Sequence, residues 1–124
     1  MAAQNVKVGF IGLGRMGQPM AARLHAAGYP LTVFDVNAEN GEQFTSAHPG
    51  VTLADGLAAF NPCDTVILVL PDSDAVDAVI LGQNDRQGLV SILRTGAVGI
   101  DMSSSQPLRT RLLAKALSDT GKHF

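Results

Sequence analysis

The sequence predicts a doubly wound α/β fold, in which a parallel sheet is covered by helices on both faces. Short apolar segments alternate along the chain with amphipathic stretches of about ten residues, as expected for strands joined by crossover helices. One segment, Thr65–Leu70, is apolar at successive positions, which is typical of a central strand that is buried on both faces. The length of 124 residues fits one domain.

The first part of the chain predicts two strand–helix units. Val6–Ile11 is expected as a strand that enters a glycine cluster. Met16–Ala27 is expected as a helix, because its apolar residues recur at three- and four-residue steps and Gly28 follows as a C-terminal cap. Leu31–Val36 carries β-branched and aromatic residues and predicts a second strand, and Asn37–Ala47 predicts a polar helix.

The rest of the chain continues the alternation. Val51–Leu53 predicts a short strand, Thr65–Leu70 the buried strand, and Asp72–Leu81 a helix capped by Asp72, Ser73 or Asp74. Gly82–Gly88 predicts a polar loop, Leu89–Leu93 a short apolar helix or turn, and Gly96–Asp101 a strand. Pro107–Ser118 predicts a helix, and Lys122–Phe124 the beginning of a further strand.

Composition excludes several classes of protein. Hydrophobic residues make up 46% and charged residues 16%, which argues against disorder. The net charge of −2 offers no basic footprint for nucleic acid, and no apolar run approaches the roughly 20 residues that span a membrane. Cys63 is the single cysteine, so no internal disulfide forms, and the N-terminus lacks the pattern of a secretory signal. We therefore expect a cytoplasmic location.

A glycine-rich loop joins the first predicted strand to the first predicted helix. It reads Gly12-Leu13-Gly14-Arg15-Met16-Gly17, which is the GxGxxG pattern in the context that makes the pattern informative. Gly12 permits a tight turn, Gly14 lets the backbone approach a pyrophosphate, and Gly17 lets the helix pack closely on the sheet. The sequence thus predicts a Rossmann-type dinucleotide-binding site, although the same glycines also suit ordinary turns and FAD and SAM folds share part of the pattern.

Asp35 strengthens the dinucleotide interpretation. It ends the second predicted strand at close to the offset of about 20 residues at which an acid accepts hydrogen bonds from the adenosine ribose. A carboxylate there repels a 2′-phosphate, and Val36 and Asn37 bring no arginine beside it, so NAD is favoured over NADP. Arg15 keeps NADP as a minority interpretation. The alternative is that Asp35 is a solvated strand end.

Other polar residues form no convincing site in the sequence. His25, His48 and His123 are scattered without the spacing of metal ligands, so no metal is expected. We expect His25 to be an exposed helix residue and Cys63 to be a small buried side chain rather than a nucleophile. The acidic residues at the start of the helix after the buried strand, Asp72, Asp74 and Asp77, are explained by the helix dipole and by solvent.

Three segments together resemble a known family. The segment GFIGLGRMGQPMAARLHAAGYPLTVFDVN resembles the N-terminal signature of the β-hydroxyacid dehydrogenases, the family of 3-hydroxyisobutyrate dehydrogenase and tartronate semialdehyde reductase. Leu70-Pro71-Asp72 is similar to the loop of that family after the fourth strand. Asp101-Met102-Ser103-Ser104-Ser105-Gln106-Pro107 is similar to its D-x-S-[ST]-x-x-P segment. The three motifs cover nearly the whole chain.

The resemblance implies a role for each motif. Gly12, Leu13, Gly14, Arg15, Met16 and Gly17 would hold the pyrophosphate of NAD. Asp35 and Asn37 would hold the adenosine ribose, and Leu70 and Pro71 the middle of the cofactor. Ser103 would face the substrate, and Ser104 both nicotinamide and substrate. Serines after the carboxyl end of a strand suit that role, but Ser103–Ser105 equally suit an N-cap before Pro107.

The resemblance also implies a longer parent protein. In the family, a catalytic lysine lies in a later G-x-x-G-x-G-x-x-x-K-x-x-N segment, which none of Lys7, Lys115 and Lys122 matches. An all-helical C-terminal domain is absent as well. Residues 1–124 are therefore expected to be a dinucleotide-binding domain that is incomplete at its C-terminus and inactive alone, with the missing domain or an exposed sheet edge available for homo-oligomerisation.

The expected parent enzyme is an NAD(P)-dependent 3-hydroxyacid dehydrogenase. It would interconvert a small β-hydroxyacid and its semialdehyde by hydride transfer. Two alternatives stay open at this stage. One is an imine reductase or a 6-phosphogluconate dehydrogenase-like relative, and the other is a stand-alone nucleotide-binding module without catalysis.

Overall fold

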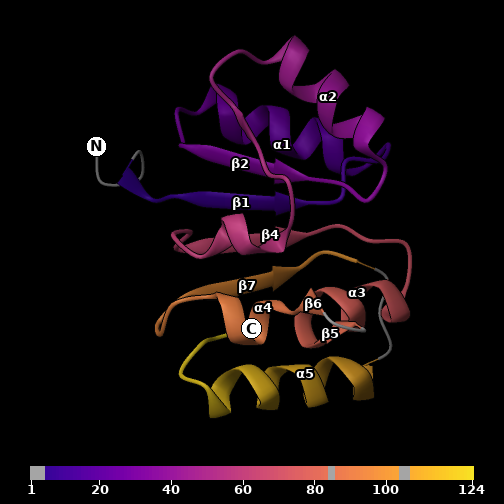
Figure 1. The fold of residues 1–124 in the computed structure, drawn as a ribbon, viewed down its shortest axis with the longest axis vertical. Helices are drawn as coiled ribbons and strands as arrows, with labels where there is room; N and C mark the ends of the chain where they lie inside the picture. The colour runs from indigo at the N-terminus through magenta and orange to yellow at the C-terminus, as the bar shows by residue number, and fades with distance from the viewer. Residues whose placement is uncertain (1–4, 84–85, 104–106) are drawn as a thin grey trace.

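The computed structural model describes residues 5–83, 86–103 and 107–124. Its centre is a parallel sheet of five strands in the order β3-β2-β1-β4-β7 (Figure 1). These strands are β1 (Val8–Ile11), β2 (Leu31–Phe34), β3 (Thr52–Leu53), β4 (Thr65–Leu68) and β7 (Val98–Asp101). The doubly wound α/β prediction is confirmed.

Helices join the strands. The α-helices are α1 (Gly17–Ala26), α2 (Ala38–Ala47), α3 (Ser73–Leu81), α4 (Leu89–Ile92) and α5 (Pro107–Asp119). A 3₁₀ turn, η2 (Leu57–Phe60), lies between β3 and β4, and a small hairpin, β5 (Gly82–Gln83) with β6 (Arg86–Gln87), follows α3. In Figure 1, α1 and α2 lie toward one end of the long axis and α3, α4 and α5 toward the other.

The order of the strands reverses between β1 and β4. Val8 of β1 is paired with Leu31 of β2 on one side and with Thr65 of β4 on the other, so the chain winds outward in both directions from this pair. In open α/β sheets, ligands bind beyond the carboxyl ends of the strands at this kind of switch point. The loops that follow Ile11, Phe34, Leu68 and Asp101 therefore form the edge where a ligand is expected.

The core has two layers, one on each face of the sheet. Alternate residues of the central strands point to opposite faces, since Phe10 belongs to one cluster while Ile11 belongs to the other. The first layer packs under α1 and α2, where it includes Ala21 and Phe44. The second packs under α3, α4 and α5 and includes the fully buried Leu68. Burial on both faces fixes the sheet that carries the loops.

Several predicted boundaries shift at the sheet edges. The first strand begins at Val8 rather than Val6, because the Lys7 amide donates to a carboxylate oxygen of Asp64 at 2.9 Å instead of joining the ladder. The second strand ends at Phe34, since Val36 is 90% exposed beyond the sheet. Asn37 precedes α2 rather than opening it, because its backbone is extended (φ −86°, ψ 103°).

The segment Gly82–Gly88 was expected to be a polar loop and instead carries the β5–β6 hairpin. Gly82 has a φ of 93°, which favours glycine. A Cβ on Gly88 would lie 2.3 Å from the carbonyl oxygen of Ile80, so only glycine fits there. These two glycines allow close backbone packing at the hairpin. The segment has no alternating apolar residues, which is why the sequence did not predict strands there.

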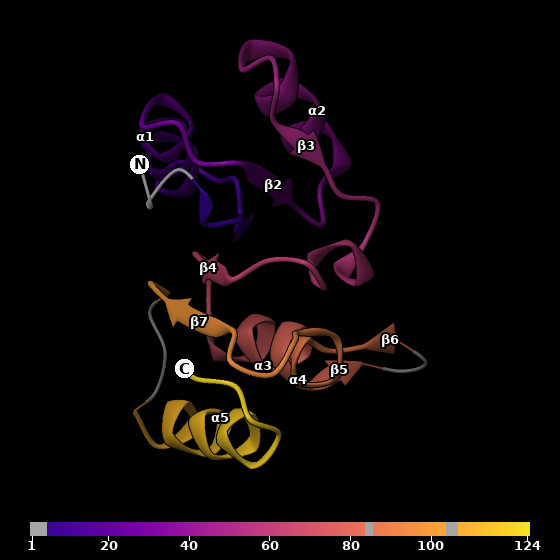
Figure 2. The ribbon, with the colours of Figure 1, turned by 90° about the vertical axis from the view of Figure 1, so that its left-hand side faces the viewer.

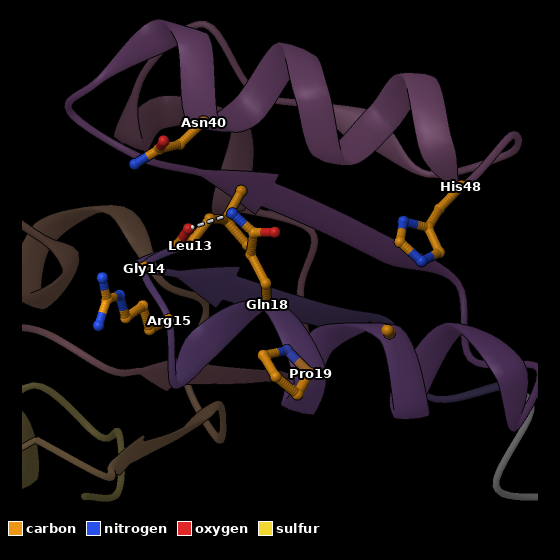
Figure 3. Close-up of a pocket in the computed structure, with 8 residues that line it drawn as sticks. Leu13, Gly14, Arg15, Gln18, Pro19, Asn40 and His48 are labelled. Atoms are coloured by element: carbon orange, nitrogen blue, oxygen red, sulfur yellow. Dashed lines mark hydrogen bonds between the residues drawn. The ribbon is translucent and has the colours of Figure 1, made fainter.

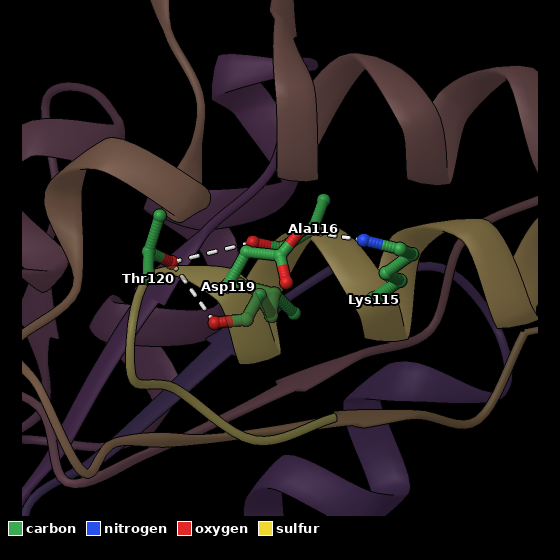
Figure 4. Close-up of polar contacts among 5 residues, drawn as sticks. Lys115, Ala116, Asp119 and Thr120 are labelled. Atoms are coloured by element: carbon green, nitrogen blue, oxygen red, sulfur yellow. Dashed lines mark hydrogen bonds and ion pairs between the residues drawn. The ribbon is translucent and has the colours of Figure 1, made fainter.

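The C-terminal end of α5 is closed by polar contacts (Figure 4). The Lys115 ammonium lies 2.9 Å from an Asp119 carboxylate oxygen, and the Thr120 hydroxyl donates to the Leu117 carbonyl at 2.9 Å. Beyond this end, His123 forms a parallel bridge with Val98 of β7. The predicted beginning of a further strand is present only as this isolated bridge, and residues 122–124 form no strand.

No described helix is long and apolar enough to cross a membrane.

Candidate dinucleotide site

The glycine loop is built so that each of its three glycines meets a different environment. Gly12 has a φ of 107°, and a Cβ on it would lie 2.0 Å from the Val69 carbonyl oxygen. A Cβ on Gly17 would lie 1.9 Å from the Gly12 carbonyl oxygen. A Cβ on Gly14 would meet no protein atom within 4 Å. The protein itself therefore requires glycine at the first and third positions, whereas the space at Gly14 is open.

The open space lies at the beginning of α1. The helix starts at Gly17, and the N-cap residue Met16 is 71% exposed and makes no side-chain cap. The amides of a helix's first turn have no partner within the helix and carry the positive end of its dipole. The start of α1 is exposed and has no side-chain cap, and the space at Gly14 is open. It is therefore suited to bind an anionic group.

Asp35 holds the glycine loop against the end of β2. One of its carboxylate oxygens accepts a hydrogen bond from the Leu13 amide at 2.7 Å, and the other accepts one from the Asn37 amide at 2.8 Å. Both bonds are charge-assisted, which makes them stronger than neutral ones. Each oxygen retains a second lone pair, so the fixed carboxylate can still accept from a ligand hydroxyl.

Asn37 has a role that the family resemblance did not include. Its side-chain oxygen accepts from the Glu39 amide at 3.1 Å, which makes it the N-cap of α2. The side chain is exposed beside Asp35, so capping and ligand contact are compatible. Asparagine is among the most favourable N-cap residues.

Leu70 and Ser103 are 33 residues apart in the chain and meet at this edge. The Leu70 amide donates to the Ser103 hydroxyl oxygen at 2.7 Å, and the Ser103 amide donates to an Asp101 carboxylate oxygen at 2.8 Å. The predicted loop after β4 is thereby fastened to the segment after β7. Pro71 is exposed next to this contact. Ser104, and with it most of the predicted N-cap segment Ser103–Ser105, lies outside the described residues.

A groove of about 540 Å³ opens beside the glycine loop, between α1 and α2 (Figure 3). Gly14, Arg15 and Asn40 lie at the same end of the groove in Figure 3, and His48 lies at the other end. Gln18 donates from its side-chain amide to the Leu13 carbonyl at 2.8 Å, which braces the loop from the α1 side. Arg15 is exposed, so its guanidinium is available to an anion.

A second pocket, of about 500 Å³, was not predicted from the sequence. We call it the hairpin pocket, because the β5–β6 hairpin forms one of its walls; Figure 2 shows this hairpin beside α3 and α4. Phe34 and Val36 at the end of β2 line the pocket, as does Leu57 of η2. Among the lining residues that the structure describes, Asp55 and Arg86 are ionisable. Because these segments are distant in the chain, no local sequence motif predicts the pocket.

The histidines and the cysteine lie away from the carboxyl ends of the strands, where a ligand is expected. His25 and His48 pack edge to face with ring centroids 5.7 Å apart, and His25 is half-buried, so its expected exposure was wrong. Cys63 is buried as predicted, and burial, with a smaller effect of the Asp64 carboxylate, raises the pKa of its thiol to about 11. Such a thiol is a poor nucleophile at neutral pH.

Asp64 makes charged contacts at the amino-terminal edge of the sheet, opposite the edge where a ligand is expected. The Lys7 amide and, to a smaller degree, the Arg94 guanidinium hold the pKa of this carboxyl below its ordinary value. Arg94 and Asp64 also form an ion pair. Because Asp64 immediately precedes β4, its bonds fasten the start of that strand rather than the ligand edge.

The strand order and the glycine loop at the switch point define a Rossmann-type dinucleotide-binding domain. The sequence profile of the NAD-binding domain of 6-phosphogluconate dehydrogenase matches residues 7–124. The chain belongs to this family of NAD-binding domains.

Relatives specify the resemblance further. 3-Sulfolactaldehyde reductase from Escherichia coli is 40% identical over 92% of this chain and 37% of its own length. Mitochondrial 3-hydroxyisobutyrate dehydrogenase from Mus musculus is 35% identical over 98% of this chain and 35% of its own length. The structure of 3-hydroxyisobutyrate dehydrogenase from Mycobacterium tuberculosis superposes with a TM-score of 0.83 at 26% identity, over 96% of this chain and 38% of that one.

These relatives confirm the predicted resemblance to the N-terminal domain of the β-hydroxyacid dehydrogenases. The chain spans little more than a third of the length of the relatives it matches, 37% of the first and 35% of the second.

Proposed function

We propose that the chain is the cofactor-binding part of an NAD-dependent dehydrogenase that interconverts a small β-hydroxyacid and its semialdehyde. The observation that carries the proposal is the open glycine at the start of α1. Gly14 has room for an approaching group, while Gly12 and Asp35 fix the loop around it. Family membership supports the choice of NAD.

In this proposal, NAD lies along the carboxyl edge of the sheet. Its pyrophosphate contacts the segment Gly12–Gly17, including the backbone of Leu13 and Met16 and the side chain of Arg15. The adenosine ribose contacts Asp35 and Asn37, and the adenine enters the hairpin pocket, whose wall at Phe34 and Val36 adjoins Asp35. An apolar pocket with a few polar groups suits a nucleobase.

The nicotinamide end lies toward the Leu70–Ser103 contact. Leu70 and Pro71 support the middle of the cofactor, and Ser103 and Ser104 orient the carboxylate or carboxamide groups beyond it. The Ser103 hydroxyl accepts from the Leu70 amide at 2.7 Å and donates to the Leu68 carbonyl over 3.5 Å, a long bond that a ligand acceptor can replace. These residues bind and orient, and they do not move the substrate proton.

When bound, the cofactor supplies the hydride acceptor and donor. The substrate hydroxyl must lose its proton as the adjacent carbon loses hydride, and a base is required for this proton. We assign that base to the family lysine, which is absent from this chain. Residues 1–124 alone are then inactive, and a homo-oligomer of the parent would form through the substrate-binding helical domain or through an exposed edge of this sheet. We place the protein in the cytoplasm.

Calorimetric titration of the chain with NAD and NADP, at fixed salt, tests the proposal. Saturable binding of NAD, which Asp35→Ala weakens about tenfold by releasing the glycine loop and removing a ribose acceptor, supports the site. Asp119→Ala, an exposed carboxylate on α5, is the matched control and should bind like the parent chain. Absence of NAD binding, or equal binding by both variants, would contradict the assigned site.

A further inference from the structure

Arg86 lies in the hairpin pocket together with residues that flank Asp35. The sequence offers no arginine directly after Asp35, which is where a 2′-phosphate partner is ordinarily sought. In the fold, however, Arg86 lines the same pocket as Phe34 and Val36, the neighbours of Asp35 in the chain. A cation about fifty positions away in the sequence thus shares a pocket with the end of β2.

Arg86 is held by the pairing of β5 with β6. Gln83 pairs with Arg86 and Gly82 pairs with Gln87 in the antiparallel hairpin. A Cβ on Gly82 would lie 2.5 Å from the Arg86 carbonyl oxygen, so the two short strands are in close contact. The hairpin follows α3 without a linker, because α3 ends at Leu81 and β5 begins at Gly82. The hairpin pairing, directly after α3, therefore holds the backbone of Arg86 at the wall of the pocket.

Arg86 brings a positive charge to a pocket whose other described ionisable residue, Asp55, is acidic. Arg86 and Asp55 are the ionisable side chains among the described lining residues, and Arg86 is exposed. Both oxygens of Asp35 accept backbone hydrogen bonds, which stabilise its negative charge, so a 2′-phosphate near Asp35 requires a cationic partner. Guanidinium groups bind phosphate by two parallel hydrogen bonds, which suits Arg86 to a dianionic group.

We propose that Arg86 is a specificity-determining residue that binds the 2′-phosphate of NADP at the adenosine end of the site. This inference rests on the proposed cofactor site. It predicts that the chain accepts NADP as well as NAD, with Asp35 favouring NAD and Arg86 narrowing the preference.

Adenosine fragments isolate this end of the site from the nicotinamide end. The chain is titrated calorimetrically with 5′-ADP and with 2′,5′-ADP, and then with NAD and NADP. The variants are Arg86→Ala, Arg86→Lys, and the matched control Arg23→Ala, an exposed arginine on α1 that does not line the pocket. Circular dichroism melting verifies that each variant folds.

Arg86→Ala is expected to weaken 2′,5′-ADP and NADP about tenfold while 5′-ADP and NAD change less than about twofold, because only the 2′-phosphate loses a charged partner. Arg86→Lys should weaken 2′,5′-ADP and NADP less than Arg86→Ala does, and Arg23→Ala should bind all four ligands like the parent chain. The salt dependence of 2′,5′-ADP binding should also become shallower in Arg86→Ala.

Two further results separate the two hypotheses. If 5′-ADP and NAD bind but Arg86→Ala leaves 2′,5′-ADP unchanged, or weakens 5′-ADP equally, the role of Arg86 is refuted while the cofactor site stands. If none of the four ligands binds the folded chain, the proposed cofactor site fails and the inference fails with it.

Discussion

Substitution of single glycines in the loop separates what the fold requires from what the cofactor requires. At Gly17, an added Cβ would lie 1.9 Å from the Gly12 carbonyl oxygen and 3.2 Å from the Phe10 ring, so the backbone must move. Overpacking of this kind costs about 1–3 kcal/mol. For a domain of this size, about 4 °C of melting temperature is lost per kcal/mol, so Gly17→Ala should melt roughly 4–12 °C lower.

At Gly14, an added Cβ meets no protein atom within 4 Å, and its φ is not among the positive values. We therefore expect Gly14→Ala to change the free energy of unfolding by less than about 0.5 kcal/mol. The same methyl group would occupy the space that the pyrophosphate approaches, so NAD binding should weaken at least about tenfold.

Thermal melting and calorimetric NAD titration of the parent chain and both variants test this separation. A Gly14→Ala chain that binds NAD like the parent would refute the assignment of the pyrophosphate to this loop. A Gly14→Ala chain that melts as low as Gly17→Ala would show that the contacts of the loop have been misjudged.

Three further predictions concern individual side chains. Ser103→Ala removes the partner of the Leu70 amide and should cost about 1 kcal/mol in urea unfolding; an unchanged midpoint would contradict the contact. Cys63, whose thiol pKa is raised to about 11, should react with a disulfide reagent slowly in the folded chain at neutral pH and fast after unfolding, and equal rates would contradict its burial. The Asp64 pKa is lowered on folding, so its stabilisation is present above the ordinary value of 3.8 and is lost as the pH falls below it. The melting difference between the parent chain and Asp64→Asn should therefore shrink in acid, whereas a difference that persists at low pH would count against the Lys7 and Arg94 contacts.

Much of the fold was predictable because its signals are local. The apolar run of β4 and the periodic face of α1 are contiguous in the sequence, and both elements form close to where they were expected. The glycine loop was predictable for the same reason. Its three glycines stand close together between a strand and a helix, although the carbonyl that crowds Gly12 belongs to the distant Val69.

What escaped prediction depends on residues that are distant in the chain. The hairpin pocket joins the end of β2, the segment after β3 and the β5–β6 hairpin, so its composition is fixed only by the packing of these segments. The bond between Leu70 and Ser103 has the same origin, since it spans two neighbouring strands of the sheet. His25 was misjudged because its exposure is set by His48, which belongs to a different helix terminus.

The most direct test of the proposed cofactor site is a backbone amide NMR titration of the chain with NAD. We predict progressive, saturable shifts at Leu13, Gly14 and Met16 and around Asp35, while the α5 residues Lys115 and Asp119 remain unmoved. Shifts confined to the far end of the groove at His48, or no shifts at NAD concentrations that saturate calorimetry, would contradict the account.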